Sequence, residues 1–467
     1  MYKANLLQTT LNLTSLGSYK HSSLALLQSK LKAFFGNQAF DLSLIKDNLA
    51  GINVYPYLDS LQPLQTSDVF VLDTLSIENA EKKVLEGTCF WEHAAAGEGT
   101  RLGLGTKYTI DLSKYSKDEI LQWITDEATS TGAFSTSWSE EVFSRLRDPK
   151  SLLSLSLGIR HMLQLVYELK KLATKYQLEP EQVMGRQKML VILNNETAST
   201  IIDEFHRYHF LSFNPVNIYF MVQDSFSGIF LKEGVLFYDE QKDNKRLHNH
   251  GQMVMQKLHE NSIFHFVDGE KIFLSPQEYL ELMDKHDVMV SYNIEDTTYL
   301  TGAIDYSALT LALQLGIQEY EMVMEIVGQN RLKPQRGGAA FYDPILKKNI
   351  MVESMCLGNY DLSAIHYLNK NCNYYPHPAR SLRAVRQQGL PMPITIKKGN
   401  DGKEYIYFCP PQGDINFLVK TAFVVRKELK PIQNWKSPIT VIPTIEAMQQ
   451  QDGQPGFKEL AQGLGIL

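Results

Sequence analysis

The sequence predicts an α/β protein with a central mixed, mainly parallel sheet, a helical N-terminal region and a small C-terminal α+β part. Two observations support this fold class. Short apolar runs that end in polar residues alternate with a helical pattern between residues 188 and 223, and similar apolar runs follow at 288–294 and 337–342. Alternation of strands with helices is typical of a parallel sheet that helices cover.

The N-terminal region, residues 1–80, is predicted to be mostly helical. Its segment 22–36 places Leu24, Leu27, Leu31 and Phe34 at helical spacing and ends at Gly36. The central region, residues 81–385, also contains helices. Its residues 151–176 form the longest amphipathic run, with basic residues near the end as a helix dipole favours.

The strands of the central region are predicted from runs that are apolar on both faces. KMLVILNN (188–195) predicts a buried strand, 197–212 a helix and VNIYFMVQ (216–223) a second buried strand. In the C-terminal region, residues 386–467, the segment 394–408 predicts a hairpin with its turn at 399–402.

Composition narrows the class of protein. The net charge of -6 argues against a dedicated nucleic-acid binder, which would usually be basic. The four cysteines are scattered, so neither a disulfide framework nor a cysteine zinc site is indicated. The start of the chain has no apolar signal region, and the apolar runs are too short for a membrane helix. We expect a cytoplasmic protein without membrane insertion; a protein exported without a signal peptide would look the same.

The segment HAAAGEGTRLGLGTKYTIDL (93–112) concentrates glycines at positions 97, 99, 103 and 105 around Arg101, just before Lys107. Each glycine loses more conformational entropy on folding than another residue, so this density needs a reason. A backbone that approaches an anion closely, with cations beside it, is such a reason. The spacing matches neither a P-loop nor the G-x-G-x-x-G dinucleotide motif. The alternative is a mobile surface loop.

Residues 95–103, with Lys107 downstream, resemble the sugar-nucleotidyltransferase signature L-x-G-G-x-G-T-R-[LM]-G followed by P-K. The likeness is strongest to the UDP-sugar pyrophosphorylase family, especially its UDP-N-acetylglucosamine pyrophosphorylase branch. Further segments resemble that family in the same order along the chain, over roughly residues 85 to 440. They are 189–210, 216–223, 248–258, 290–299, 337–354 and 420–438.

This resemblance implies a fold and a reaction. The fold would be the Rossmann-like, GT-A-like sheet of nucleotidyltransferases, with residues 81–385 as the catalytic domain. The reaction would join UTP and a sugar 1-phosphate into a UDP-sugar and pyrophosphate, with Mg²⁺ as the cofactor. Such chemistry needs no covalent enzyme intermediate, only two anions held in line with their charge offset.

The resemblance also implies nucleotide-binding residues. The backbone around Ala95, Ala96, Gly97, Glu98, Gly99 and Thr100 would hold the triphosphate. Arg101 would grip the leaving β/γ-phosphates, and Lys107 would contact the α-phosphate in the transition state. Gln223 would form hydrogen bonds with a uracil edge, although a polar residue that merely ends a strand is nearly as good an interpretation of it. Gly251 would let the base stack near the backbone.

The second half of the implied site serves the metal and the sugar phosphate. Glu295 and Asp296 end a predicted strand and would supply hard oxygen ligands to Mg²⁺. The sugar-phosphate candidates are Glu353, Asn371, Asn373, Lys397 and Lys398. His248 and His250 form an H-x-H pair, but no acidic or cysteine ligand lies at zinc spacing nearby.

The sequence departs from the family pattern at several places, and the usual second glycine pair reads Ala95-Ala96-Gly97. Thr106 replaces the proline before the lysine, and the loop that leads to Lys107 is about one residue shorter. The metal-site Asp-Asn reads Glu295-Asp296, and Glu92 and His93 occupy positions that are normally apolar. A first alternative is therefore a degenerate family member that binds nucleotide or UDP-sugar as a regulator. A glycosyltransferase is a second, although no D-x-D motif is present. The sugar, the nucleoside and the oligomeric state stay open.

Overall fold

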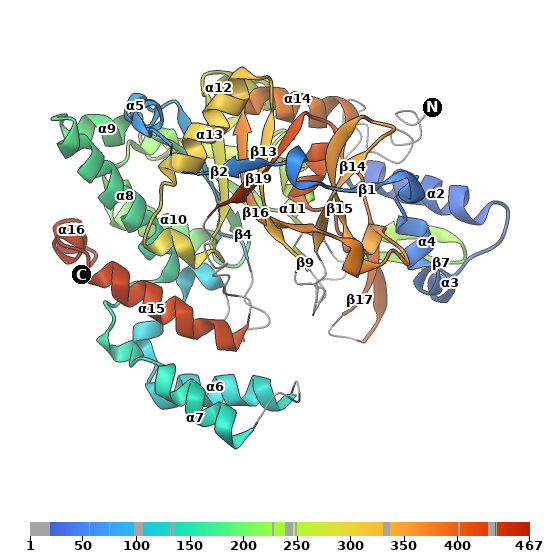
Figure 1. Ribbon diagram of the computed structural model, residues 1–467, viewed down its shortest axis with the longest axis horizontal. Coiled ribbons are helices and arrows are strands. Elements are labelled where there is room, and N and C mark those ends of the chain that lie inside the picture. The colour runs from blue at the N-terminus through green and yellow to red at the C-terminus, as the bar shows by residue number, and fades with distance from the viewer. Residues whose placement is uncertain are drawn as a thin grey trace.

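The computed structural model describes residues 19–467 except 56, 74, 98–105, 131, 133–134, 227, 239–245, 248–249, 330–336, 400–401, 428–434 and 436. Its centre is a mixed sheet with the strand order β11-β10-β5-β4-β3-β12-β16-β13-β19-β2 (Figure 1). Helices cover both faces of this sheet. The α/β fold class and the mixed, mainly parallel central sheet are confirmed.

Four parallel strands form the middle of the sheet: β5 (Ile218–Gln223), β4 (Lys188–Asn194), β3 (Cys89–Ala94) and β12 (Val288–Asn293). Their carboxyl ends lie along one edge of the sheet, where ligands of open α/β sheets bind. Next comes β16 (Tyr367–Pro376), which is antiparallel to β12 and places Asn373 beside Ser291. A strand from late in the chain thus delivers its polar residues to the same edge.

The remaining strands extend the sheet on both sides. Beyond β16 lie β13 (Met322–Gly328), β19 (Thr421–Arg426) and β2 (Phe70–Leu72), which are parallel to one another. At the opposite edge, β10 (Ile263–Val267) is antiparallel to β5, and β11 (Glu270–Leu274) is antiparallel to β10. A branch of the sheet contains β14 (Gly338–Asp343), β15 (Lys348–Glu353) and β1 (Gln62–Pro63).

The alternation of side chains along the strands divides the core into two layers. On β4, Met189, Val191 and Leu193 face one layer, whereas Leu190 and Ile192 face the other. The first layer is covered by α5 (Glu78–Glu86), α8 (Leu157–Lys175), α9 (Pro180–Arg186), α10 (Ala198–Arg207), α13 (Tyr306–Ile317), α15 (Val441–Asp452) and α16 (Phe457–Gly463). The second is covered by α2 (Tyr19–Phe35), α4 (Leu49–Asn53), α11 (His250–Gln256), α12 (Pro276–Asp284) and α14 (Pro378–Gln388). Burial on both faces explains why these strands read as continuous apolar runs.

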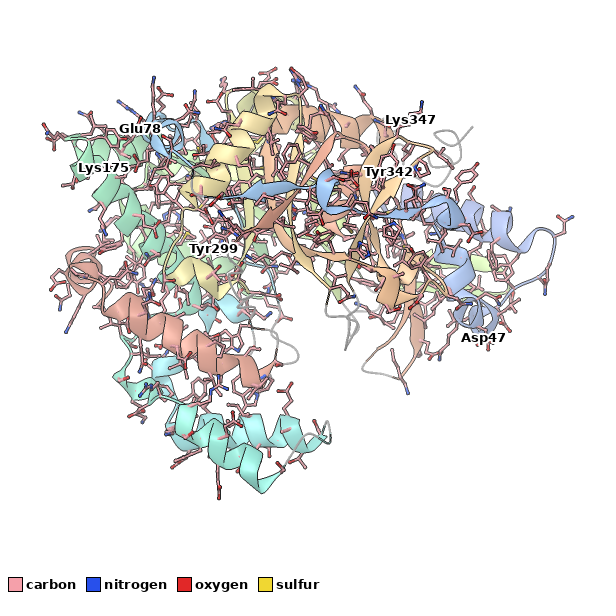
Figure 2. The ribbon with its side chains drawn as sticks, viewed as in Figure 1. Asp47, Glu78, Lys175, Tyr299, Tyr342 and Lys347 are labelled. Carbon is pink, nitrogen blue, oxygen red and sulfur yellow. The ribbon has the colours of Figure 1, made fainter. Side chains whose placement is uncertain are left out.

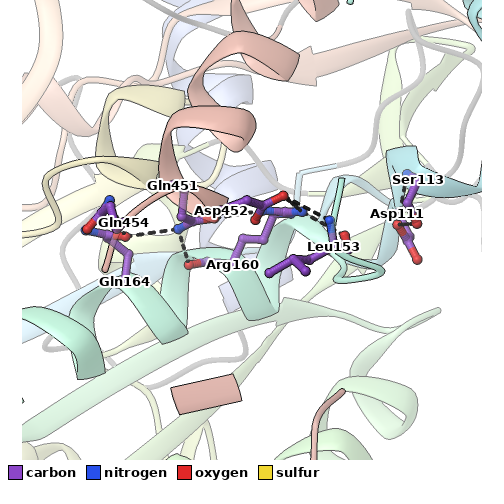
Figure 3. A network of polar contacts seen from close by, with 8 residues as sticks. All are labelled: Asp111, Ser113, Leu153, Arg160, Gln164, Gln451, Asp452 and Gln454. Atoms are coloured by element: carbon purple, nitrogen blue, oxygen red, sulfur yellow. Dashed lines mark hydrogen bonds and ion pairs between the residues drawn. The ribbon is translucent and has the colours of Figure 1, made fainter. Parts of the chain in front are cut away.

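Helix α8 is tied to α15 by a buried polar network (Figure 3). Arg160 donates to both carboxylate oxygens of Asp452, at 2.6 and 3.1 Å, and to the carbonyl oxygen of Leu153 at 2.7 Å. The amide of Gln451 donates to the Arg160 carbonyl oxygen at 3.0 Å and to Gln164 at 3.2 Å. The bonds from Arg160 satisfy the two terminal nitrogens of a guanidinium that is almost fully buried, whereas its Nε has no hydrogen-bond partner among the described residues.

Several predicted elements are present with shifted ends. The helix expected over 151–176 begins at Leu157, because the Ser156 hydroxyl accepts from the Ile159 N–H as its N-cap. The helix expected over 197–212 ends at Arg207, after which Phe210 and Leu211 take left-handed φ values of 52°. The predicted hairpin is β17 (Ile394–Lys398) with β18 (Glu404–Phe408).

The hairpin belongs to a separate four-stranded sheet with β7 (Ile229–Lys232) and β8 (Val235–Tyr238). The short strands β6 (Ser225–Phe226) and β9 (Arg246–Leu247) pair with each other. Helices α6 (Lys117–Ser130) and α7 (Thr136–Arg145) lie below the sheet in Figure 1, and α3 (Leu42–Asp47) lies near α2 at the right. The division into three regions stays a prediction. In the described part of the chain, every helix is too short or too polar to cross a bilayer.

Candidate active site

A cavity of about 290 Å³ opens at the carboxyl end of β12. It collects Glu295, Asp296, Glu353 and Asn373, all of which the sequence analysis assigned to the metal or the sugar phosphate, together with His250. These residues come from the β12 end, β15, β16 and α11, which are far apart in the chain. Tyr299, which also lines the cavity, lies in the middle part of the molecule in Figure 2, away from the peripheral Asp47 and Lys347.

Lys107 contacts the wall of this cavity through Glu295. The Lys107 ammonium nitrogen lies 2.5 Å from Glu295 Oε1, and the lysine is only 4% exposed. The Glu295 carbonyl oxygen accepts from the Trp435 N–H at 2.9 Å, which fixes the backbone at this point. The structure therefore brings together the lysine assigned to the α-phosphate and a carboxylate assigned to the metal.

Asn194 joins the two ends of the glycine-rich segment. Its amide nitrogen donates to the Ala96 carbonyl oxygen at 3.1 Å and to Thr106 Oγ1 at 3.2 Å. Its side-chain oxygen accepts from the N–H groups of Glu196 and Thr197 and from the Thr197 hydroxyl. Residue 194 thus connects the loop base to the start of α10. Ala95 is held as well, because its N–H donates to the Ile192 carbonyl oxygen at 2.8 Å.

Gly97 lies at the last described position before the loop interior. Its carbonyl oxygen accepts from the Lys107 N–H at 3.3 Å, and a Cβ added at Gly97 would meet no heavy atom of a described residue within 4 Å. The described residues therefore leave space beside this backbone. The candidates Glu98, Gly99, Thr100 and Arg101 lie outside the described residues.

The carboxylates at the cavity fit a Mg²⁺ ion by their chemistry. Asp296 Oδ1 accepts from the Thr298 N–H at 3.0 Å and from the Thr298 hydroxyl at 2.6 Å, so these bonds orient the carboxylate. Burial raises the pKa of Asp296, and the bonds from Thr298 oppose that shift. Among the described residues no group of three or more His, Cys, Asp or Glu side chains forms a ready metal site. Mg²⁺ commonly uses one or two carboxylates and completes its shell with water and substrate phosphates.

The sugar-phosphate candidates Glu353 and Asn373 also line the cavity. Asn373 is 4% exposed, and its Oδ1 has no hydrogen-bond partner within the described part of the protein. Glu353 is half-buried beside Asp414, whose pKa is raised far above its usual range by burial and further by Glu353. Lys30, which comes from α2, opposes that shift. This shift in pKa favours the protonated form of Asp414.

Sequence reasoning missed a charged group behind this cavity. Lys370 Nζ lies 3.0 Å from Glu325 Oε1, and Arg426 binds the same carboxylate through two nitrogens at 2.6 and 2.8 Å. Arg426 also pairs with Asp305 at 2.8 Å. A second cavity of about 500 Å³ is lined by these residues and shares Asp296, Tyr299 and Lys370 with the first. Lys370 lies in the asparagine-rich run 369–373, and that run was the sequence feature that could have revealed this charged group.

Three predicted residues, Lys397, Lys398 and Gln223, do not line the cavity. Lys397 lies on β17 with its ammonium 3.6 Å from the centre of the Tyr407 ring, and Lys398 is exposed on the same strand. Gln223 is buried at the end of β5. Asn371 lies on β16, and His248 lies outside the described residues.

Gly251, which the sequence analysis assigned to a nucleotide base, packs against the segment 410–411. A Cβ at this position would lie 2.7 Å from the Pro410 carbonyl oxygen and 2.9 Å from that of Pro411. The Gly251 N–H also donates to the Pro410 carbonyl oxygen at 2.8 Å. The glycine therefore lets α11 approach the segment 410–411, and Pro411 is itself a cavity residue.

No family model matches the sequence, and no curated protein matches it either. Solved structures do match the fold of this chain. A uridine diphosphate N-acetylglucosamine pyrophosphorylase from Trypanosoma brucei, in complex with an inhibitor, matches with a TM-score of 0.55 at 12% identity, covering 95% of this chain and 81% of its own. A UDP-glucose pyrophosphorylase mutant from Leishmania major, in complex with UDP-glucose, matches with a TM-score of 0.53 at 12% identity, covering 87% of this chain and 72% of its own.

These matches extend over most of both chains, so they concern the whole architecture and not a single motif. Both place the chain beside enzymes named for UDP-sugar pyrophosphorolysis. The chain has the fold of the UDP-sugar pyrophosphorylases.

Proposed function

We propose that the protein is a uridylyltransferase that joins UTP and a sugar 1-phosphate into a UDP-sugar and pyrophosphate. The observation that carries the proposal is the gathering of Lys107, Glu295, Asp296, Glu353 and Asn373 around one cavity at the carboxyl edge of the sheet. The solved structures with this fold carry the names of enzymes of this class, and one of them contains UDP-glucose.

The chemistry follows from the charges at this edge. A phosphate oxygen of the sugar 1-phosphate attacks the α-phosphorus of UTP and forms a P–O bond. The bond from that phosphorus to the bridging oxygen breaks, and pyrophosphate leaves in line. Lys107 offsets the charge that develops on the α-phosphoryl oxygens. Because its ammonium is paired with Glu295 in this structure, it reaches a phosphate by leaving or sharing that carboxylate.

Glu295 and Asp296 would hold a Mg²⁺ ion, which when bound supplies charge neutralisation to the phosphates. The space that the described residues leave beside Gly97 suits the close approach of a triphosphate to backbone N–H groups. Glu353 and the unpartnered Oδ1 of Asn373 accept hydrogen bonds from sugar hydroxyls. These assignments place the nucleotide phosphates near Lys107 and the sugar on the wall formed by β15 and β16.

The test is a substrate panel. Purified protein is incubated with Mg²⁺ and each pair of a nucleoside triphosphate (UTP, ATP, CTP, GTP) with glucose 1-phosphate, galactose 1-phosphate or N-acetylglucosamine 1-phosphate, and pyrophosphate release is recorded. We expect release with UTP and with at least one sugar phosphate. A protein that binds UTP tightly but releases no pyrophosphate with any sugar phosphate would support the degenerate-binder alternative.

The same panel tests nucleoside choice. We expect UTP to raise the melting temperature more than ATP does at matched concentration, because a ligand that binds the native state more tightly stabilises it more. Equal shifts for the two nucleotides would contradict uridine recognition.

A further inference from the structure

A buried ion pair lies directly beneath the cavity. Glu92, in the middle of β3, pairs with Lys257, which follows α11, and their side chains are 2% and 1% exposed. Taking a carboxylate and an ammonium out of water is costly unless both are paired and hydrogen-bonded. The strand that carries Glu92 is otherwise filled with apolar or aromatic side chains. A charge at this position therefore needs an explanation beyond packing.

The second oxygen of Glu92 connects the ion pair to the cavity wall. Glu92 Oε1 accepts from the Ser291 hydroxyl at 2.9 Å and from the Gln412 amide nitrogen at 3.3 Å. The Gln412 amide nitrogen also donates to Ser291 Oγ at 3.0 Å. Ser291 and Gln412 both line the cavity, whereas Glu92 and Lys257 do not. Within the described part of the chain, Ser291 and Gln412 thus link the buried pair to the cavity.

These contacts fix the orientation of one amide. A carboxylate can only accept hydrogen bonds, and Lys257 can only donate. The Gln412 amide must therefore direct its N–H groups toward Glu92, since the reverse orientation would place its carbonyl oxygen against a carboxylate. The Gln412 amide also forms a hydrogen bond with the Tyr375 hydroxyl, and this bond opposes the rise in the pKa of Tyr375 that burial causes, so the amide N–H is the donor there too. None of these contacts uses Gln412 Oε1. The acceptor end of the amide is left for a ligand in the cavity.

We propose that Gln412 is a specificity-determining residue that offers its carbonyl oxygen to a hydroxyl or amide N–H of the sugar, and that Glu92 is the positioning residue that keeps it so oriented. Lys257 pairs with Glu92 Oε2 and so leaves Glu92 Oε1 to Ser291 and Gln412. This inference rests on the proposed function, because it takes the cavity as the sugar site. Together with Glu353 and Asn373 it makes this wall a surface of acceptors, which selects ligands rich in hydrogen-bond donors.

The experiment is a double-mutant cycle on Glu92→Gln and Gln412→Ala. The amide introduced at position 92 must keep its carbonyl oxygen toward Lys257, so an N–H group then faces Gln412, whose amide turns over. We expect each single variant to raise the KM for the sugar phosphate about three- to tenfold, as the loss of one hydrogen bond would. The KM for UTP and kcat should change less than twofold. The double variant should match the single ones, because both changes act on the same acceptor.

Two further variants separate positioning from stability. Glu92→Met/Lys257→Met removes the ion pair and all hydrogen bonding at position 92, and such replacements often preserve stability. It should fold, as measured by urea unfolding, and still raise the sugar-phosphate KM. Arg160→Met/Asp452→Leu removes another buried ion pair, on α8 and α15, that lines no described cavity near the site. That control should leave the sugar-phosphate KM unchanged.

Independent effects, in which the double variant shows the product of the two single changes, would overturn the positioning role of Glu92. An unchanged sugar-phosphate KM for Gln412→Ala in a folded, active enzyme would overturn the specificity role and leave the proposed function intact. If the wild type forms no UDP-sugar, the same cycle is measured as the Kd for UDP-glucose and UDP-N-acetylglucosamine by calorimetry. A wild type that binds neither overturns both proposals.

Discussion

Asn194 provides a direct test of how the sheet edge holds the glycine-rich segment. It is fully buried and makes two bonds to the base of that segment and three to the start of α10. A net value of about 1 kcal/mol for each bond gives an upper figure near 5 kcal/mol. Three of the bonds converge on one oxygen, and α10 can bind water at its first N–H groups. We therefore expect Asn194→Ala to lower the free energy of unfolding by about 3 kcal/mol.

The functional consequence is separable from the loss of stability by Asn194→Asp. The carboxylate keeps the acceptor at the start of α10, where the helix dipole favours negative charge. It loses both donor bonds to Ala96 and Thr106 and places an oxygen against the Ala96 carbonyl. We expect Asn194→Asp to keep more stability than Asn194→Ala while both weaken UTP binding about tenfold, which is about 1.4 kcal/mol.

The assay combines urea unfolding, analysed by linear extrapolation, with the UTP Kd from calorimetry. Asn214→Ala is the matched control, because Asn214 caps a 3₁₀ turn through its own side chain on the surface away from the cavity. The reasoning is refuted if Asn194→Ala unfolds with wild-type stability, or if both Asn194 variants bind UTP with the wild-type Kd.

Three other outcomes are expected. Lys107→Ala should lower kcat by about 10²–10³ with only a few-fold change in UTP Kd, whereas Arg101→Ala should mainly weaken UTP binding. Single-turnover rates, with the surface variant Lys46→Ala as the control, check this, and a wild-type kcat for Lys107→Ala would rule out the role of Lys107. Glu353→Ala should weaken sugar-phosphate binding by about 1.5–3 kcal/mol, read as KM, and an unchanged KM would contradict it. The raised folded-state pKa of Asp414 means that the wild type loses stability as pH rises from the carboxyl's ordinary value of 3.8 through that raised pKa, so Asp414→Asn should be increasingly the more stable protein over this range. Urea unfolding across pH 4 to 8 checks this, and parallel stability curves for the two proteins would count against it.

The parts of the fold that depend on local pattern could be predicted from the sequence. The strands at 188–194 and 218–223 and the helix between them follow from apolar runs and the polar residues that end them. β3 was the difficult strand, because Glu92 and His93 interrupt its apolar character. Glu92 is tolerated there by Lys257, whose position 165 residues later the local pattern does not reveal.

The candidate site likewise combines features that local sequence suggests with contacts that only the fold creates. Glu295, Asp296, Glu353 and Asn373 line one cavity because strands far apart in the chain meet at one edge of the sheet. Gly251 was assigned to a base; in the structure it packs against Pro410, and only the fold places those two segments together. Lys397 carries a charge suited to a phosphate, yet its strand belongs to the separate sheet. Residue chemistry suggested these candidates, and long-range placement decides which of them share a cavity.

The parallel pairing of β2 with β19 has a consequence for synthesis of the protein. Asp73, next to β2, forms its ion pair with Lys427, next to β19, across 354 positions of the chain. At about 5–20 residues per second, a ribosome needs roughly 20 to 70 s to add that length. During this interval the nascent chain carries β2 with no strand beside it. Completion of the sheet is therefore a late event in translation, and chains that terminate before β19 leave this edge unpaired and prone to aggregation.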